Sequence, residues 1–226
     1  MSDLPKEVFA AEGAHEAVLR HLVRQRPNLA GLRILDLPCG RGAFSRRLLE
    51  SSAKVVAVDL APRDDLLFDH QHFRSADANQ PLPFESASFD VVISIEGIEH
   101  FENPSLFLRE LHRVLVPGGL AIVSTPNVNA LWSRWELFRR GYHCHFQPVS
   151  DGEKMSGHLL PIDAVFIRGA AERAGMTLVE IGTSDTNRKN WFWEWLRPRL
   201  FKRLPSWIRA GELAYGEVSV YVFARS

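Results

Sequence analysis

The 226-residue chain has 27 basic and 27 acidic side chains, so its formal net charge is zero, and 46% of its residues are hydrophobic. This composition is typical of a single globular domain, expected to span residues 1–226, and it lacks the basic balance of a nucleic-acid-binding protein. No stretch approaches the roughly 20 apolar residues of a membrane span, and the N-terminus has no apolar signal region, so we expect a cytoplasmic location. Two cysteines, Cys39 and Cys144, offer neither a disulfide framework nor a metal spacing.

Apolar residues recur every three or four positions between residues 7 and 26. This period predicts a helix with one buried face, covering an edge of a sheet. Arg20 and His21 flank the apolar positions, and we expect both side chains to be solvated.

Residues 33–49 combine a short apolar run ending in Asp36, a turn with Pro38, Gly40 and Gly42, and an amphipathic segment. This order predicts a strand, a tight loop and a helix. The glycines let the backbone approach a ligand because they carry no Cβ, and Asp36 would face the crevice in which open α/β sheets bind ligands. The pattern indicates a nucleotide-cofactor loop, although glycine turns also join strands to helices in many other α/β proteins.

A second β-branched run, residues 54–60, ends at Asp59, about 20 residues beyond the glycine loop. At that separation an acid on the neighbouring strand can accept hydrogen bonds from both ribose hydroxyls of a nucleoside. Residues 73–78 predict a short third strand and its exit, where Asp77 could bond an adenine amine.

Residues 91–95 have the continuous apolar character of a central parallel strand. A helix over 106–115, a turn over 116–119 and a strand over 120–124 follow. The regular alternation from residue 33 to 125 predicts a doubly wound α/β fold with a mostly parallel sheet.

Several segments, in the order and at the spacing of the family, together resemble the class I S-adenosylmethionine-dependent methyltransferases: residues 36–42, Asp59, Asp77 before 81–84, 89–92, Glu99-His100 and 115–119. The resemblance is close over about residues 30–126, the cofactor-binding half. It implies a seven-stranded sheet that ends in an antiparallel hairpin, with residues 177–181 and 217–223 as its last two strands. Pro38 departs from the glycine that is usual in the family and removes one N–H from the loop.

The resemblance also implies S-adenosylmethionine as the cofactor. The positions that correspond to the family's cofactor-binding residues are Asp36, Gly40, Gly42, Asp59, Leu60, Asp77, Ala78 and Ile95. In the family, the glycines pass under the methionine part, the second acid holds the ribose, the third borders the adenine, and the end of the fourth strand lies near the sulfonium.

Methyl transfer from a sulfonium requires alignment of the nucleophile and exclusion of water, and a hydroxyl acceptor must also lose its proton. Glu99 and His100 are the candidate catalytic residues. On one helical turn, Glu96, Glu99 and His100 would share a face and suit Mg²⁺, Mn²⁺ or Zn²⁺.

The sequence Glu-x-x-Glu-His resembles the metal-binding motif of quinone-pathway O-methyltransferases and of methyltransferases that cap small RNA ends, in which a later histidine adds a ligand. His158 is the best-placed later histidine, and His143 and His145 are alternatives. Without a metal, His100 would act as a base or shape the acceptor pocket.

Two insertions are expected on the acceptor side, over about residues 125–161 and 187–209. Aromatic residues of the first could form a water-excluding lid, or Trp132, Trp135 and Phe138 could pack a helix, since they recur at helical spacing. Tryptophans and cations alternate over 188–209, which fits peripheral contact with the inner membrane face; packing at the acceptor site or at a dimer interface is the alternative.

The sequence therefore predicts an enzyme that transfers a methyl group from S-adenosylmethionine to a hydroxyl of a small, partly apolar acceptor, such as a quinone precursor, a sugar or a secondary metabolite. One alternative is an RNA-end 2′-O-methyltransferase, which the zero net charge disfavours. Another is a non-catalytic partner or regulatory protein that retains the cofactor fold. A nicotinamide-dependent enzyme is disfavoured because Ser45 occupies the third glycine position. The acceptor and the oligomeric state are not predicted.

Overall fold

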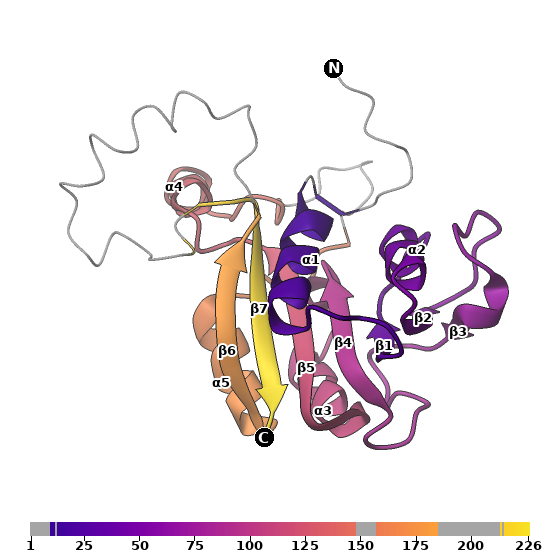
Figure 1. Cartoon of the computed structure of the whole chain (residues 1–226). Helices are drawn as coiled ribbons and strands as arrows, with labels where there is room; N and C mark the ends of the chain where they lie inside the picture. Colours follow the sequence, from indigo (N-terminus) through magenta and orange to yellow (C-terminus); the bar gives the residue numbers. More distant parts are fainter. Residues whose placement is uncertain (1–9, 12, 148–156, 185–212, 214) are drawn as a thin grey trace.

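The structure, a computed structural model, describes residues 10–11, 13–147, 157–184, 213 and 215–226. Its centre is a seven-stranded sheet in the order β3-β2-β1-β4-β5-β7-β6 (Figure 1). The strands are β1 (Arg33–Asp36), β2 (Lys54–Asp59), β3 (Phe73–Ser75), β4 (Phe89–Ile95), β5 (Leu115–Pro126), β6 (Met176–Thr183) and β7 (Val218–Arg225). Strands β1 to β5 pair in parallel, and β7 runs antiparallel to both β5 and β6. The predicted fold class is confirmed.

Helices cover both faces of this sheet. They are α1 (Ala14–Gln25), α2 (Ala43–Glu50), α3 (Pro104–Val114), α4 (Leu131–Arg140) and α5 (Ala164–Arg173), with short 3₁₀ helices η1 (His70–His72) and η2 (Ile98–His100). The first two helices pack with one apolar cluster and α3 and α5 with another, one on each side of the strands. Alternate residues of β4 enter the two clusters, since Val91 and Ile93 join the first and Val92 the second.

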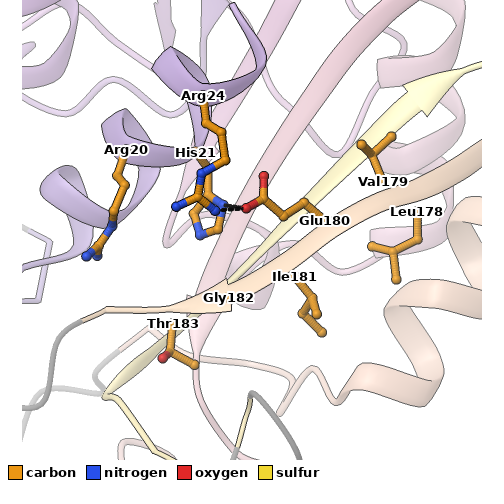
Figure 2. Close-up of a pocket in the computed structure, with 9 residues that line it drawn as sticks. All are labelled: Arg20, His21, Arg24, Leu178, Val179, Glu180, Ile181, Gly182 and Thr183. Atoms are coloured by element: carbon orange, nitrogen blue, oxygen red, sulfur yellow. Dashed lines mark hydrogen bonds and ion pairs between the residues drawn. The ribbon is translucent and has the colours of Figure 1, made fainter.

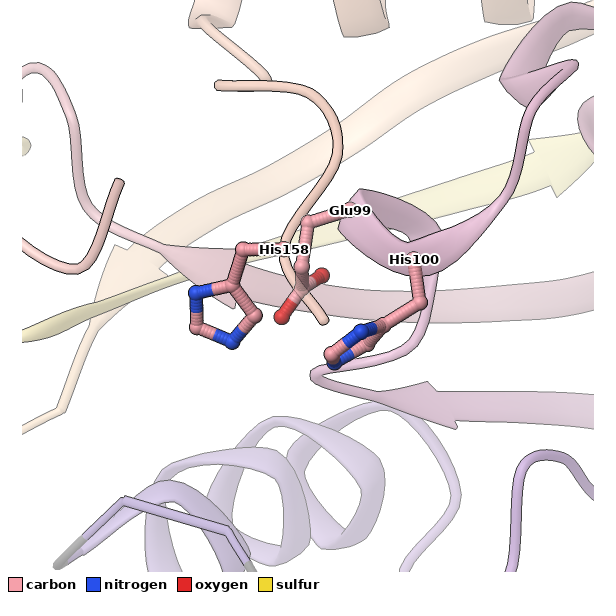
Figure 3. Close-up of side chains that lie close together, drawn as sticks. All are labelled: Glu99, His100 and His158. Atoms are coloured by element: carbon pink, nitrogen blue, oxygen red, sulfur yellow. The ribbon is translucent and has the colours of Figure 1, made fainter. Parts of the chain in front are cut away.

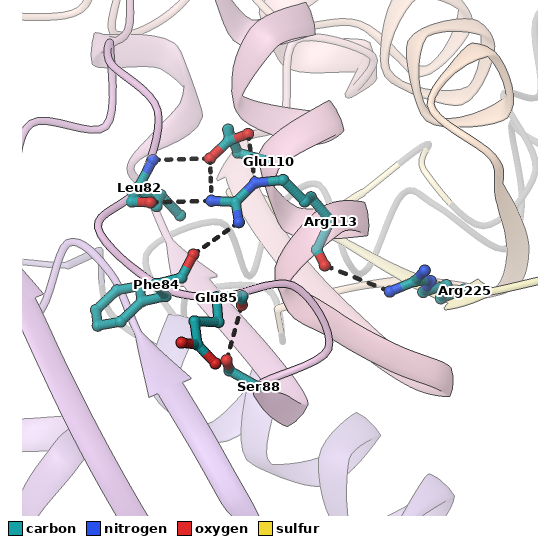
Figure 4. A network of polar contacts seen from close by, with 7 residues as sticks. All are labelled: Leu82, Phe84, Glu85, Ser88, Glu110, Arg113 and Arg225. Carbon is teal, nitrogen blue, oxygen red and sulfur yellow. Dashed lines mark hydrogen bonds and ion pairs between the residues drawn. The ribbon is translucent and has the colours of Figure 1, made fainter.

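A polar network at the amino edge of the sheet fixes the approach to β4 (Figure 4). Arg113 of α3 donates to Glu110 and to the carbonyl oxygens of Leu82 and Phe84, and the Leu82 N–H donates to Glu110. Arg225 of β7 in turn donates to the Arg113 carbonyl oxygen. These bonds attach the loop before β4 to α3 and so fix the start of β4. The other end of β4 lies at the carboxyl edge of the sheet.

The prediction that His21 is solvated is wrong. The buried face of α1 consists of residues 14, 17, 18, 21 and 22, which is the regular helical period, and His21 is 5% exposed. Its Nδ1 lies 3.0 Å from Glu180 Oε1. Figure 2 shows His21 and Arg24 of α1 in contact with Glu180 of β6, and these residues line, together with Arg20, a cavity of about 590 Å³.

One strand boundary also differs from its prediction. Strand β5 already begins at Leu115, which pairs with Phe89, and the expected turn over 116–119 forms an irregularity inside β5 before Leu120 pairs with Val91. Glycine at position 118 adopts φ 75°, which allows the chain to bulge and resume the same strand.

The predicted contact segment 188–209 and residues 148–156 of the first insertion lie outside the described residues. Among the helices of the described part, none is long and apolar enough to cross a membrane.

Candidate functional site

A cavity of about 280 Å³ lies at the carboxyl ends of three neighbouring strands. Asp36, Asp59 and Ile95 are the last residues of β1, β2 and β4, and all three line it. The other lining residues are Ala10, His15, Pro38, Cys39, Gly40, Arg41, Ala43, Phe44, Arg63, Glu96 and His100. The sheet topology therefore brings the glycine loop, the second acid and the end of β4 to one place, where open α/β sheets bind ligands.

The glycine loop is built on positive backbone angles. Gly40 has φ 54° and Gly42 has φ 80°, and Gly42 precedes the first turn of α2. A Cβ at Gly42 would lie 1.9 Å from the ring of Phe68, so no larger residue fits there without displacing that ring.

Asp59 is oriented by the loop itself. Its Oδ2 accepts from the Gly40 N–H at 2.8 Å and its Oδ1 from the Leu60 N–H at 2.8 Å. Both bonds come from rigid backbone, so the carboxylate keeps one orientation at the cavity wall.

Asp36 lies at the base of the cavity and is 1% exposed. The Ser45 hydroxyl donates to its Oδ2. Burial raises the pKa of Asp36 to about 7, and the nearby Asp59 contributes in the same direction. A cation bound beside Asp36 would favour the ionised carboxylate.

Three polar residues in the lining, His15, Arg41 and Arg63, were not predicted as site residues by the sequence analysis. His15 lies on α1 beside the buried face, with its ring 5.3 Å from that of Phe44. Burial and the positive charge of Arg47 lower the pKa of His15 to about 4, so the ring is neutral at pH 7. The helical period of α1 would have found His15, because position 15 adjoins buried residues 14 and 18.

Four of the predicted cofactor residues do not line the cavity: Gly42, Leu60, Asp77 and Ala78. Leu60 is 67% exposed. The Asp77 carboxylate accepts from the Asn79 N–H at 2.8 Å, and Ala78 packs against the apolar cluster under α3.

A second group of side chains adjoins the cavity at His100. One possible metal-ligand atom from each of Glu99, His100 and His158 lies within 4.8 Å of the others. Figure 3 shows the Glu99 carboxylate between the two imidazole rings. Glu99 and His100 belong to η2, directly after β4, whereas His158 arrives from the end of the first insertion. The Leu159 and Leu160 N–H groups both donate to the Glu99 carbonyl oxygen, at 2.8 and 3.2 Å, which fixes the returning segment against η2.

Backbone carbonyls set the tautomer of both histidines. His100 Nδ1 lies 2.8 Å from the Gly157 oxygen, and His158 Nδ1 lies 2.9 Å from the His145 oxygen. A carbonyl oxygen can only accept, so we assign the proton of each neutral ring to Nδ1 and the lone pair to Nε2. This is the arrangement in which an imidazole can take a proton or bind a metal.

Glu99 is fully buried, and neither of its carboxylate oxygens forms a hydrogen bond within the described residues. Burial raises the pKa of Glu99 to about 8, and the Glu96 carboxylate adds to this effect. Because buried charges are normally paired, this carboxyl group is suited to hold a proton or a cation.

Glu96 lies apart from this cluster. It adopts φ 47° before η2 begins, so it does not share a helical turn with Glu99. Its Oε2 accepts from the Ala11 N–H. Of the alternative histidines, His143 pairs with the Ser133 hydroxyl at 3.0 Å, and His145 contributes its carbonyl to His158.

Trp132, Trp135 and Phe138 of the first insertion lie on a helix, α4, as their spacing predicts. Of the two alternatives for these side chains, packing against the protein is not what the structure shows, because Trp132 is 50% exposed, Trp135 52% and Phe138 83%.

Comparison with known proteins identifies relatives over about half of the chain. A family described as methyltransferase domain matches residues 35–123. The ubiquinone biosynthesis O-methyltransferase of Ruegeria pomeroyi is 38% identical over 121 residues, covering 49% of this chain and 47% of that protein. Its counterpart in Caulobacter sp. is 37% identical over 111 residues, covering 45% and 44%. The chain thus spans about half the length of the curated relatives it matches.

Similar solved structures cover nearly the whole chain. An S-adenosylmethionine-dependent methyltransferase from Archaeoglobus fulgidus has a TM-score of 0.63 at 17% identity and covers 94% of both chains. The 1,6-didemethyltoxoflavin-N1-methyltransferase of Burkholderia thailandensis, with S-adenosylhomocysteine bound, has a TM-score of 0.61 at 16% identity and covers 96% of this chain and 80% of its own. At such identities the likeness shows the fold.

Proposed function

We propose that this chain transfers a methyl group from S-adenosylmethionine to a hydroxyl of a small, partly apolar acceptor, since residues 35–123 match a family described as methyltransferase domain and its relatives include O-methyltransferases. One observation carries the proposal: the cavity bounded by Asp36, Gly40 and Asp59 extends to His100, whose Nε2 lone pair can accept a proton.

The donor would occupy the strand end of the cavity. Asp36 suits the α-ammonium group, since a cation there favours its ionised form, and Asp59 suits the ribose hydroxyls because its carboxylate is already oriented by two N–H groups. Ile95, at the end of β4, would lie beside the sulfonium and keep water from the methyl group.

The acceptor would approach from the side of η2. His100 would take the hydroxyl proton at Nε2, and its bond to the Gly157 carbonyl would hold the ring in the required tautomer. The buried Glu99 would stabilise the imidazolium that results. The curated relatives act in ubiquinone biosynthesis, which favours a phenolic hydroxyl of a quinone precursor as the acceptor.

The same three residues fit a divalent cation. Glu99, with both oxygens buried and without a hydrogen bond from the described residues, and the Nε2 atoms of His100 and His158 would hold Mg²⁺, Mn²⁺ or Zn²⁺. A cation bound there would lower the pKa of an acceptor hydroxyl. Glu96, the fourth predicted ligand, accepts a hydrogen bond from the Ala11 N–H instead.

Membrane contact through 188–209 and a place at the inner membrane face remain part of the proposal, supported by the sequence alone.

The function is tested by calorimetry with S-adenosylhomocysteine, followed by methyl transfer from labelled S-adenosylmethionine to a panel of substituted catechols and to small RNA ends. Saturable cofactor binding and labelling of a catechol oxygen are expected. Labelling of RNA alone would reject the small-molecule acceptor. No cofactor binding would favour the non-catalytic alternative.

The metal is tested separately by thermal unfolding of chelated protein with added Mn²⁺ or Zn²⁺. At about 100 times the dissociation constant, binding stabilises the fold by about 2.7 kcal/mol, which raises Tm by roughly 5–10 °C for a chain of this size. Glu99→Gln should lose this increase. Full turnover after chelation, with no metal effect on Tm, would exclude the cation and leave His100 as the base.

A further inference from the structure

Four fully buried side chains in and above the sheet carry polar atoms that have no hydrogen bond among the described residues. They are Ser94, Glu99, Thr125 and Tyr221. Buried polar groups in folded proteins are nearly always hydrogen-bonded, so several such groups in one region indicate a shared partner.

The three strand residues of this set face the same side of the sheet. Ser94 of β4 and Tyr221 of β7 both pair with Val123 of β5, one from each side. Thr125 is two residues beyond Val123, so its side chain points to the same face. That face is packed with α3 and α5, because Val123 and Tyr221 belong to their apolar cluster.

Glu99 reaches this face from η2, which packs on β5 and contributes Ile98 to the same apolar cluster. Burial raises the pKa of Glu99 to about 8, and the Thr125 hydroxyl is close enough to oppose this rise, yet no direct hydrogen bond joins the two groups. Two buried polar groups that lie close together without a direct bond have the arrangement that one bridging water satisfies.

A second pair repeats this arrangement one strand away. Ser219 is the cross-strand partner of Thr125, and its hydroxyl donates to the Thr125 carbonyl oxygen at 3.2 Å. Burial raises the pKa of Tyr221 to about 12, and the Ser219 hydroxyl opposes this rise without forming a hydrogen bond to Tyr221 Oη. Thr125, Ser219 and Tyr221 thus form a row of hydroxyl groups that leads from Glu99 across β5 to β7.

Water is the partner that suits this row. A hydroxyl group both donates and accepts, and a buried water typically makes about three hydrogen bonds to groups of this kind. The ring of Tyr221 stacks on that of Phe223 at 6.3 Å, which gives Oη a fixed place at the end of the row.

We propose that Thr125, Ser219 and Tyr221, linked by buried water, form a hydroxyl chain that orients the Glu99 carboxyl group beside His100. Thr125 and Tyr221 are then positioning residues for methyl transfer. The inference rests on the proposed role of Glu99 beside His100, but the chain itself can be tested without turnover.

The chain is tested first by counting buried water with oxygen-17 magnetic relaxation dispersion. Thr125→Val keeps the shape of the side chain and Tyr221→Phe keeps the ring contact with Phe223, so each change removes only a hydroxyl group. Each variant should hold at least one buried water fewer than the wild type. Thr177→Val, the same change at an exposed position of β6, should hold as many as the wild type. Equal counts in all four proteins would overturn the proposal.

Turnover is then measured with the same variants, after circular dichroism has shown that each is folded. Thr125→Val should lower kcat about tenfold, because the carboxyl group loses a hydrogen bond, and should leave the Kd of S-adenosylhomocysteine within about twofold. Thr125→Ser, which returns the hydroxyl group, should restore kcat to within about threefold of the wild type. Wild-type kcat in Thr125→Val, or no restoration by Thr125→Ser, would overturn the positioning role.

The double change Thr125→Val with Tyr221→Phe decides whether the residues act together. Both changes interrupt the same chain, so the double variant should lose no more turnover than Thr125→Val alone. Losses that multiply would mean independent effects and would overturn the chain. If the wild type transfers no methyl group, the proposed function fails, and the buried-water counts still decide whether the chain exists.

Discussion

The donor and acceptor sides of the site differ in whether their buried carboxyl groups accept hydrogen bonds from the chain itself. On the donor side, Asp36 accepts from Ser45, and Asp59 accepts from Gly40 and Leu60. On the acceptor side, Glu99 is just as buried but lacks a hydrogen bond from the described residues. Helix α4, on the same side, exposes its apolar residues.

The difference indicates two kinds of preorganisation. In the donor cavity, backbone N–H groups hold Asp59 and the Ser45 hydroxyl holds Asp36, so both carboxyl groups are oriented before any ligand arrives. On the acceptor side, Glu99 has no hydrogen-bond partner among the described residues, so a proton or a cation would have to neutralise its buried carboxylate. Mutations should therefore affect affinity on the donor side and turnover on the acceptor side.

The largest expected effect is on turnover. His100→Asn keeps a donor at the position of Nδ1, and so the bond to the Gly157 carbonyl, but removes Nε2. Loss of a general base should lower kcat by roughly 10²- to 10⁴-fold, while the Kd of S-adenosylhomocysteine changes less than about threefold. His143→Asn serves as the matched control. A kcat close to that of the wild type would remove His100 from the chemistry.

The next effect is on stability. The pKa of Asp36 is about 7 in the folded chain, above the ordinary value of 3.8 that holds when the chain unfolds. The folded chain therefore holds the proton more tightly, and its stability falls as pH rises between these two values. Between pH 5 and pH 8 the wild type should lose roughly 2 kcal/mol more than Asp36→Asn, measured by urea unfolding.

Asp90→Asn is the control, because the pKa of Asp90 is lowered in the folded chain whereas that of Asp36 is raised. Arg33 lowers the pKa of Asp90, so this carboxylate stabilises the fold above its unfolded pKa, by no more than about 1 kcal/mol because the pair is exposed. Parallel pH profiles for wild type and Asp36→Asn would mean that Asp36 is ionised throughout the range.

The smallest effect tests the ribose contact. Asp59→Asn removes the charge and one of the two acceptor oxygens, so the affinity for S-adenosylhomocysteine should fall about tenfold in calorimetry. Asp77→Asn, outside the cavity lining, should leave the affinity unchanged. An equal loss of affinity in Asp77→Asn would show that the adenine binds beyond the cavity. The cavity lining would then be only part of the donor site.

Sequence alone predicted what depends on local pattern. The presence of strands β1 to β5, the tight loop at Gly40 and Gly42, and the place of Asp36 and Asp59 at adjacent strand ends follow from period, turn chemistry and topology. The grouping of Glu99, His100 and His158 was predicted from the family resemblance, and the structure brings these residues together.

What sequence did not predict depends on distant contacts. Glu96 turns away from Glu99 because its backbone is left-handed and Ala11, 85 positions earlier, donates to its carboxylate. His21 lies on the buried face of α1, and its ring packs against β6, a strand formed much later in the chain, where Glu180 Oε1 lies 3.0 Å from its Nδ1. The period of Trp132, Trp135 and Phe138 predicted a helix, but a period does not say which face the protein covers.

The position of β7 has a consequence for how the chain folds during synthesis. Strand β6 leaves the ribosome first, yet it has no direct pairing with β5, because β7 occupies the place between them. The edge of β5 therefore stays unpaired while the segment after β6 is synthesised. It is paired only when residues 218–225 are made and join both strands. During that interval two apolar strand edges are unprotected, so the nascent chain should be most prone to aggregate just before β7 is made.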